Sequence, residues 1–411
     1  MTSKLFTKNF VLLILGQLTS LFGNFILKLS LSMYILETTG SAAIFAGILS
    51  AATIPTILLS PFGGILADRA DRRKIMVTLD ALSGCSVLCA ALFLDQGNSL
   101  AIIGALLVFL SVLGAFETPT VQACIPTMLS GDNITRGNAV VNQIASLSYL
   151  IAPLAGSILY SLLGLQPVMY AAVGCFFVTA LFECLIQLNC QPLQGTVNML
   201  SAIKEDFLSS MRYLAKEQPV IAKMLCMTAL SRFFVMGITL VGLPYLVRTV
   251  LGLNAKYYGA AESALAVATI LGSLAAGLLA GKMQMHHLPA VLASLGIFML
   301  PAGAAFLLPW SPFIIYIINV LCFCGMQIAI SIFSICAVSF IQQKTPNHLI
   351  GKIMAYASAI TLCVQPIGQI LYGFLFDRLS GAVYFVLLPS GLIVCATGFI
   401  SRLILPVSQH D

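Results

Sequence analysis

Charged residues are the scarcest feature of this 411-residue chain, because Asp, Glu, Lys and Arg together make up only 8% of it. A soluble domain carries about a quarter charged residues, so this composition excludes an ordinary water-soluble fold. Hydrophobic residues reach 59% and the mean hydropathy is +1.02, values typical of a chain that crosses a membrane several times. We therefore predict an all-α membrane protein.

The sequence also lacks the usual marks of metal, redox and nucleotide chemistry. The twelve cysteines include no Cys-x-x-Cys pair and lie mostly in apolar stretches, so we interpret them as small packing residues. His286 and His287 are adjacent and would point to different sides of a helix, which argues against a shared metal ion. No Gly-Lys-Ser/Thr follows the glycine-rich stretch 272–277, so ATP coupling is not supported. We expect neither a metal nor a cofactor.

Enzymes and nucleic-acid-binding proteins find no support either. The sequence contains no close Ser/His, paired-carboxylate or metal-ligand constellation, so we predict that the protein is not an enzyme. The net charge is +6, but the basic residues are scattered along short loops. We therefore expect anionic lipid headgroups, and no nucleic acid, as their partners.

Windows of about nineteen residues locate twelve hydrophobic spans, six on each side of a charged break. They lie near 10–36, 41–67, 75–95, 99–128, 137–162, 167–189, 220–249, 256–282, 288–308, 312–342, 349–376 and 381–405. Within the break, apolar residues recur at helical spacing from 203 to 214. We therefore predict an N-terminal six-helix bundle at 1–189, a cytoplasmic linker with an amphipathic helix at 190–219, and a C-terminal six-helix bundle at 220–411.

The distribution of lysine and arginine predicts the orientation. Near the span ends these residues fall on one side, and only Arg248, Lys256 and Arg378 lie on the opposite side. By the positive-inside rule, both termini and the linker are cytoplasmic. The first apolar run is too long for a signal-peptide core, so we expect it to stay in the membrane. The predicted location is the cell (inner) membrane, crossed many times.

The densest charge lies between the second and third spans, where six of the twelve residues from Gly63 to Lys74 are charged. Glycines there allow close approach of a neighbouring helix, an acid can face a helix N-terminus or an arginine, and basic side chains reach the lipid headgroups. We predict a tight turn that acts as a conformational gate and does not contact substrate. Its residues are Gly64, Asp68, Arg69, Arg72 and Arg73.

At this turn the sequence resembles the major facilitator superfamily of secondary transporters, whose corresponding loop reads Gly-x-x-x-Asp-Arg-x-x-Arg-Arg/Lys. The resemblance covers nearly the whole chain and implies two six-helix bundles that alternate access to a substrate site between them. The stretches Leu15–Asn24, Glu37–Ser41, Phe116–Pro119 and Arg212–Leu214 are similar to the bacterial branch containing macrolide efflux proteins and enterobactin exporters.

Internal similarity and two departures refine this resemblance. Residues 151–160 in the fifth span echo residues 364–372 in the eleventh, as parallel six-helix repeats would. The fifth-span antiporter pattern Gly-Pro-x-x-Gly-Gly is replaced by Ala152–Ser157, and the fourth span lacks the arginine found in many proton-coupled members. Transport direction and coupling ion are therefore left open by the resemblance.

A polar stripe runs down the first span. It consists of Gln17, Ser20, Asn24, Lys28 and Ser32, which recur at three- and four-residue steps. A lysine inside a span costs about 3 kcal/mol unless it meets water or a carboxylate, which favours a cavity lining over simple helix packing. Weaker stripes supply Asn142 and Tyr149 in the fifth span and Gln365 in the eleventh, where helix packing explains them equally well.

Charged residues inside the spans are further candidates. Glu117, in the middle of the fourth span, is expected to bind a proton or a cationic substrate, or to pair with a buried basic residue. Glu262 is expected to line an outer cavity, and Arg232 either binds an anionic substrate or pairs with an acid. Asp80 is interpreted as a partner of the cytoplasmic arginines, and Glu183 as a packing or snorkelling residue.

These observations predict a monomeric secondary transporter that works by alternating access. Its expected activity is proton-coupled export, by antiport, of amphipathic or lipophilic small molecules of the drug or siderophore type. The alternatives are a lipid or lysolipid flippase, an importer, and a membrane receptor or assembly factor that has kept the fold. The polar stripes argue against the last, because such a protein needs few polar residues in its spans.

Overall fold

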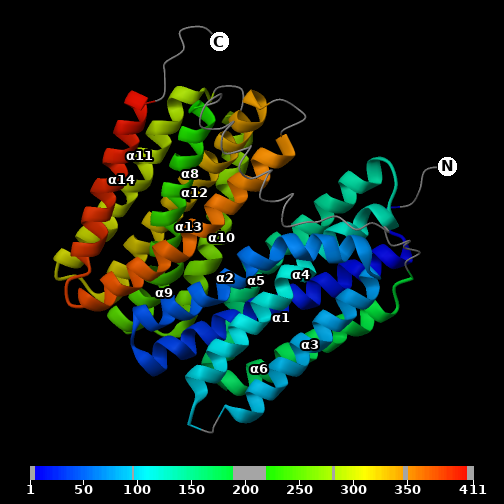
Figure 1. The fold of residues 1–411 in the computed structure, drawn as a ribbon. Coiled ribbons are helices and arrows are strands. Elements are labelled where there is room, and N and C mark those ends of the chain that lie inside the picture. The colour runs from blue at the N-terminus through cyan, green and yellow to red at the C-terminus, as the bar shows by residue number, and fades with distance from the viewer. Residues whose placement is uncertain (1–4, 95–96, 188–218, 280–282, 346–349, 405–411) are drawn as a thin grey trace. The chain divides into compact units, whose positions relative to one another are not determined.

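A computed structural model describes residues 5–94, 97–187, 219–279, 283–345 and 350–404, and these residues form helices and connecting turns without strands (Figure 1). The helices of the first half are α1 (Lys8–Thr39), α2 (Ala42–Arg69), α3 (Arg72–Phe93), α4 (Ser99–Met128), α5 (Asp132–Leu163) and α6 (Leu165–Cys184). Apart from Pro219, the predicted linker lies outside the described residues.

The second half contains α8 (Pro219–Gly237), α10 (Ala255–Leu279), α11 (Leu288–Ala304), α12 (Pro312–Lys344), α13 (Ile350–Arg378) and α14 (Tyr384–Ile404). The shorter segments are η1 (Ile238–Gly242), α9 (Leu243–Tyr245) and η2 (Leu246–Val250), which continue α8, and η3 (Met285–His287) and η4 (Ala305–Leu307), which flank α11. Within the described residues, twelve helical stretches are long and apolar enough to cross a membrane, which confirms the predicted fold class.

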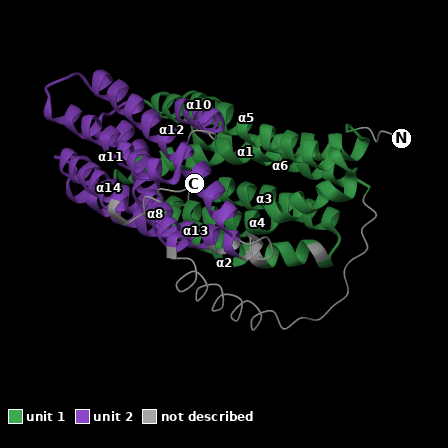
Figure 2. Ribbon diagram, turned by 90° about the horizontal axis from the view of Figure 1, so that it is seen from above, with its two compact units in different colours: residues 1–40, 48–195, 254–263 green, residues 41–47, 196–253, 264–411 purple. Residues whose placement is uncertain are grey.

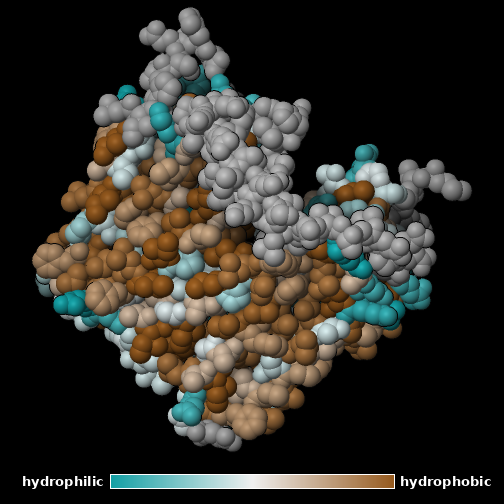
Figure 3. All heavy atoms as spheres, in the orientation of Figure 1, coloured by the Kyte–Doolittle hydropathy of each residue, from teal (hydrophilic) through white to brown (hydrophobic). Residues whose placement is uncertain are grey.

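The surface and the helix ends agree with a membrane setting. On the face drawn in Figure 3, apolar side chains cover most of the described surface, and hydrophilic ones lie mainly near helix ends. Thr7 accepts a hydrogen bond from the Phe10 N–H (3.3 Å) at the start of α1, and Gly40 ends that helix in the left-handed conformation (φ 61°). Such local caps satisfy backbone groups that hydrocarbon cannot.

The chain divides into two compact units, shown in Figure 2. Unit 1 comprises Met1–Gly40, Ile48–Gly195 and Asn254–Ser263, and unit 2 comprises Ser41–Gly47, Thr196–Leu253 and Ala264–Asp411. In unit 1, α1 packs on α5 and α6, and α3 packs on α4 and α6. In unit 2, α11 packs on α12 and α14, and α8 packs on α13. The predicted domain limits remain a prediction.

The internal sequence repeat has a counterpart in each unit. A Cβ added at Gly156 in α5 would lie 3.1 Å from Cα of Ile26 in α1, and one added at Gly368 in α13 would lie 2.3 Å from the carbonyl oxygen of Phe233 in α8. Four residues after each glycine, a tyrosine donates a hydrogen bond of 2.7 Å, from Tyr160 to Glu37 and from Tyr372 to Ser390. Each glycine thus permits a close helix approach that a larger residue would prevent.

Candidate functional site

The polar stripe predicted from the sequence leads to a cavity in unit 1. It is distinct from a cavity of about 420 Å³ at the ends of α11 and α14, which is lined by His286, His287 and Arg402. The unit 1 cavity has a volume of about 340 Å³ and lies among α1, α2, α4 and α5. Its lining from α1 includes Gln17, Ser20, Asn24 and Lys28, so four members of the stripe face one space. Leu21, Phe25 and Leu110 supply apolar wall. The cavity therefore offers polar groups within an apolar surround, as small-molecule sites do.

Opposite charges face this cavity from two helices. Lys28 on α1 is exposed toward it, and Glu117 on α4 is half-buried in its wall. The two groups interact electrostatically, and Ser20 Oγ lies 3.3 Å from Oε1 of Glu117. Because an isolated charge is costly inside a membrane, the pair makes each charge less unfavourable while leaving both accessible to a ligand.

Uncharged polar side chains belong to the same wall, and some of their buried atoms are not hydrogen-bonded within the described part of the protein. Within the described residues, Nε2 of the buried Gln17 and Oδ1 of Asn24 have no hydrogen-bond partner in the protein. Asn142 on α5 is exposed and lines the cavity. Tyr149 packs edge to face on the cavity residue Phe25, with ring centroids 5.4 Å apart. These side chains can exchange hydrogen bonds with water or with a bound molecule.

The remaining predicted site residues lie elsewhere. Glu262 on α10 accepts a hydrogen bond from the Tyr258 hydroxyl and is not among the residues that line the unit 1 cavity. Arg232 on α8 lines a separate cavity of about 260 Å³ in unit 2, together with Ser334, Ser358 and Thr361, and that lining contains no carboxyl group. Gln365 is half-buried on α13 and is not part of that lining.

Asp80 differs from its sequence interpretation, whereas Glu183 agrees with one of the two alternatives that the sequence left open. Asp80 is 1% exposed and accepts a hydrogen bond of 3.0 Å from Ser20, in place of the expected pairing with the arginines near the turn. Glu183 is fully buried, so it packs inside unit 1 and does not snorkel. The close sequence spacing of Asp80 and Lys74 was misleading, because the two residues lie on different sides of α3.

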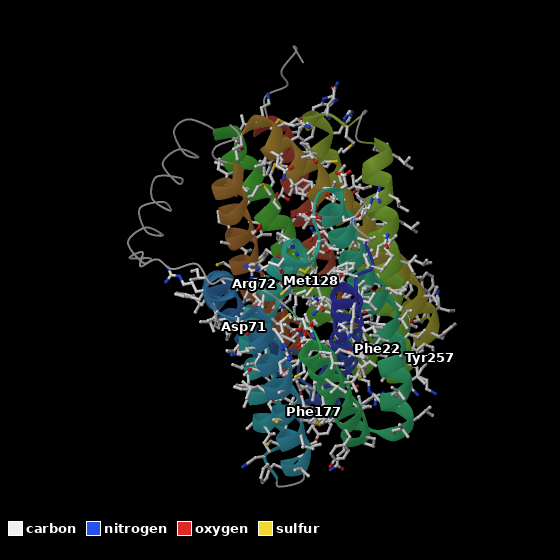
Figure 4. All side chains as sticks on the ribbon, turned by 90° about the vertical axis from the view of Figure 1, so that its right-hand side faces the viewer. Phe22, Asp71, Arg72, Met128, Phe177 and Tyr257 are labelled. Carbon is white, nitrogen blue, oxygen red and sulfur yellow. The ribbon has the colours of Figure 1, made fainter. Side chains whose placement is uncertain are left out.

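The charged turn binds helix ends together. Asp71 caps α3 by accepting from the N–H groups of Arg73 and Lys74. Arg72 donates from Nε to the Ala67 carbonyl at the end of α2 (2.7 Å) and from Nη1 to the Ala123 carbonyl in α4 (2.9 Å). Figure 4 shows Asp71 and Arg72 at the start of α3, near Met128 at the end of α4. One arginine therefore joins three helices through charge-assisted hydrogen bonds.

Other members of the predicted gate behave differently. Arg73 donates to the carbonyl of Cys184 at the end of α6. Arg69 is exposed, and the side chain of Asp68 lies outside what the structure describes. The role of Asp68 in a conformational gate thus remains a prediction, and the contacts of the turn come from Arg72 and Arg73.

The glycine that permits close packing at this turn is Gly63, not the neighbouring Gly64. A Cβ added at Gly63 would lie 2.4 Å from the carbonyl oxygen of Ala115 in α4, whereas nothing lies within 4 Å of one added at Gly64. We expect Gly63→Ala to lower the free energy of unfolding by about 1–3 kcal/mol and to reduce transport, because α2 must move away from α4. Gly64→Ala is the matched control. Equal melting temperatures of the two purified variants would contradict this packing.

One capping residue was missed by the sequence interpretation. Within unit 2, Asp377 at the end of α13 accepts hydrogen bonds from the N–H groups of Ala42 (2.6 Å) and Ala43 (3.1 Å) and from the Ser41 hydroxyl. The carboxylate therefore neutralises the first turn of α2, where the helix dipole favours an anion.

A sequence signal for this contact existed. Gly373 precedes Asp377 by four residues and Arg378 follows it, which repeats the spacing of Gly64, Asp68 and Arg69. A Cβ added at Gly373 would lie 2.5 Å from Cβ of Ala46, so this glycine, unlike Gly64, permits the approach that brings the acid to its helix.

Comparisons with known proteins are consistent with this architecture. A family model described as Major Facilitator Superfamily matches residues 13–364. Macrolide efflux protein A of Streptococcus pyogenes is 24% identical over 393 residues, 92% of each chain. Enterobactin exporter EntS of Citrobacter koseri is 24% identical over 76% of this chain and 71% of its own. A bacterial homologue of the iron transporter ferroportin, solved in an inward-facing state, aligns with a TM-score of 0.73 at 16% identity, covering 96% of this chain and 98% of that one.

Proposed function

Because the chain belongs to the Major Facilitator Superfamily, we propose that this membrane transporter carries out proton-coupled export of amphipathic or lipophilic small molecules. It is a transporter and not an enzyme, and its substrate is a small molecule. Export of compounds of the drug or siderophore type is supported by relatives that are named for macrolide efflux and enterobactin export. We further propose that both termini are cytoplasmic and that the protein works as a monomer in the inner membrane.

The unit 1 cavity is the observation that carries this proposal. Its apolar wall suits the body of a lipophilic molecule, and its amides can bind polar substituents. Glu117 provides a negative group that a protonated amine or a proton can occupy in turn. Competition between those two occupants would couple outward movement of substrate to inward movement of protons, provided that access alternates between the two sides.

Transport by the purified protein in proteoliposomes tests the function. When the proteoliposomes are acidic inside, protein inserted in the inside-out orientation should concentrate a macrolide or a siderophore within them, and a protonophore should abolish this accumulation. Concentrative transport that needs ATP would contradict the mechanism, and dependence on sodium alone would replace the proton. Movement of a fluorescent lysolipid in place of these compounds would favour a flippase, and accumulation in the opposite direction would favour an importer.

Ligand binding gives an independent prediction. A compound that occupies the unit 1 cavity should raise the melting temperature of the purified protein, with about 2.7 kcal/mol of stabilisation at a concentration of 100 times Kd. Asn24→Ala should weaken this effect, since it removes a polar group of the cavity wall. Ser294→Ala on α11, in unit 2, is the control. Equal stabilisation of both variants by every compound in a panel would show that these compounds do not bind in the unit 1 cavity.

A further inference from the structure

Two carboxyl groups meet inside unit 1 behind the cavity wall. Asp80 on α3 and Glu183 on α6 are both buried, and neither is among the cavity-lining residues. Within the described residues, Oδ2 of Asp80 and both oxygens of Glu183 have no hydrogen-bond donor. The two carboxyl groups nevertheless lie close enough to interact electrostatically. A carboxylate has no hydrogen to donate, so they can form a hydrogen bond with each other only when one of the two carries a proton.

Close packing of three helices keeps the two groups together. On α3, a Cβ added at Gly84, one turn from Asp80, would lie 3.3 Å from ring atoms of Phe177 on α6, which is labelled in Figure 4. On α1, a Cβ added at Gly16 would lie 3.6 Å from Cγ of Glu183. Small residues thus bring the helices close on both sides, and this packing excludes solvent from the carboxyl groups.

Among the residues that the structure describes, no basic side chain balances the charge of the pair. Glu117 on α4 adds a third carboxyl group near both members of the pair, and Lys28 on α1 interacts with Glu117. Arg73 on α3 donates to the backbone carbonyl of Cys184, one residue after Glu183, and not to the Glu183 carboxylate. Two facing negative charges are strongly unfavourable in such surroundings, whereas one proton removes a charge and completes the hydrogen bond.

We propose that Asp80 and Glu183 form a proton-binding pair that exchanges its proton with the cavity through Ser20 and Glu117. Ser20 Oγ lies 3.0 Å from Oδ1 of Asp80 and 3.3 Å from Oε1 of Glu117, and both Ser20 and Glu117 line the cavity. The hydroxyl has one hydrogen, so it donates to one carboxylate at a time.

Transfer along this path conserves protons and bonds. A protonated Glu117 gives its proton to Ser20 Oγ, while the hydrogen already on Oγ moves to Oδ1 of Asp80. Glu117 becomes a carboxylate, Ser20 is again a neutral hydroxyl, and the proton lies in the pair with Glu183 as its second acceptor. The reverse sequence returns the proton to the cavity. The use of this proton in transport rests on the proposed function, but the binding of the proton does not.

Infrared spectroscopy of the purified full-length protein at neutral pH tests the bound proton. The wild type should show the C=O stretch of a protonated carboxylic acid, with a shift in deuterated water, and Glu183→Gln and Asp80→Asn should each remove it. Asp132→Asn, at an exposed position at the start of α5, is the control and should leave the band unchanged. A band that persists in both variants, or that is absent from the wild type, overturns the proposal.

Thermal stability provides a second readout. Carboxyl groups of the unfolded chain lose their protons at about pH 4, whereas the folded pair keeps one at neutral pH. The melting temperature of the wild type should therefore fall as pH rises from about 4, until the folded pair also loses its proton. Glu183→Gln carries its own amide donor to Asp80 and should show a smaller fall. An identical pH dependence in the two proteins would contradict the pair even if the other variant fails to fold.

Transport separates this inference from the proposed function. Glu183→Gln should keep substrate counterflow, which needs no proton gradient. Its proton-driven accumulation of substrate should fall at least tenfold. Proton-driven transport that is unchanged in Glu183→Gln and Asp80→Asn overturns the relay while the proposed function stands. A wild type without proton-driven transport but with the variant-sensitive infrared band overturns the proposed function while the proton-binding pair stands.

Discussion

Glu117→Gln should abolish concentrative, proton-driven transport while substrate still equilibrates across the membrane. Glutamine keeps the shape of the side chain and can still accept a hydrogen bond from Ser20, but it cannot gain or lose a proton. In proteoliposomes with an imposed proton gradient, the accumulated substrate should therefore fall to the concentration in the bath. Counterflow of labelled substrate should continue for neutral compounds and weaken for cationic ones, because the negative charge in the cavity is lost.

Two further variants separate charge from shape at this position. Glu117→Asp keeps an ionisable group in the wall and should retain part of the accumulation. Thr118→Ala changes the next residue of α4, which lines the same cavity, without altering charge. Full accumulation by Glu117→Gln would assign proton coupling to another group, whereas loss of counterflow in all three variants would indicate damage to the cavity itself.

Arg72→Ala should produce the largest loss of stability among single changes at the charged turn. It removes the donors to the Ala67 and Ala123 carbonyls, and hydrogen bonds from a charged donor contribute about 1.5–3 kcal/mol each. Arg72 is half-buried and solvent can replace part of this interaction, so we expect a net loss of about 2 kcal/mol. A clear fall in melting temperature and slower transport should accompany it.

Lysine at the same position provides the matched test. Arg72→Lys keeps the positive charge, but an ammonium group lacks the planar fork that reaches two carbonyls at once, so it should recover only part of the stability. Lys74→Ala removes an exposed positive charge from the same turn and should have little effect. If Arg72→Lys matched the wild type in melting temperature and transport rate, the positive charge alone would account for the contribution of Arg72 to stability and transport.

Hydropathy predicted the spans well because a helix that crosses the bilayer must be apolar along most of its length, and its composition shows this directly. The fourth span, expected at 99–128, is α4, whereas the fifth, expected from 137, begins at Asp132. The first turn of α5 is polar, so a hydropathy window passes over it although the backbone is already helical. Helical spacing likewise predicted that Lys28 faces a cavity, since that inference needs one helix only.

Contacts between helices were the part that sequence spacing could not predict. Asp80 and Glu183 are distant in sequence, and their meeting depends on how α3 packs against α6. Gly63 and Gly64 are equivalent in any local pattern, and only the position of α4 distinguishes them. Asp377 is an intermediate case. Its spacing to Gly373 could be recognised in the sequence, but its role as a hydrogen-bond acceptor depends on where the start of α2 lies.

The cap at Asp377 also bears on the order in which the protein is assembled. Ala42 and Asp377 are 335 residues apart, so the N–H groups that open α2 leave the ribosome long before their acceptor is synthesised. Until then those N–H groups must donate their hydrogen bonds to water or to lipid headgroups. A nascent chain released before α13 would contain all of α1 to α6 and still lack this bond. The second helix to be made is therefore among the last to be completed.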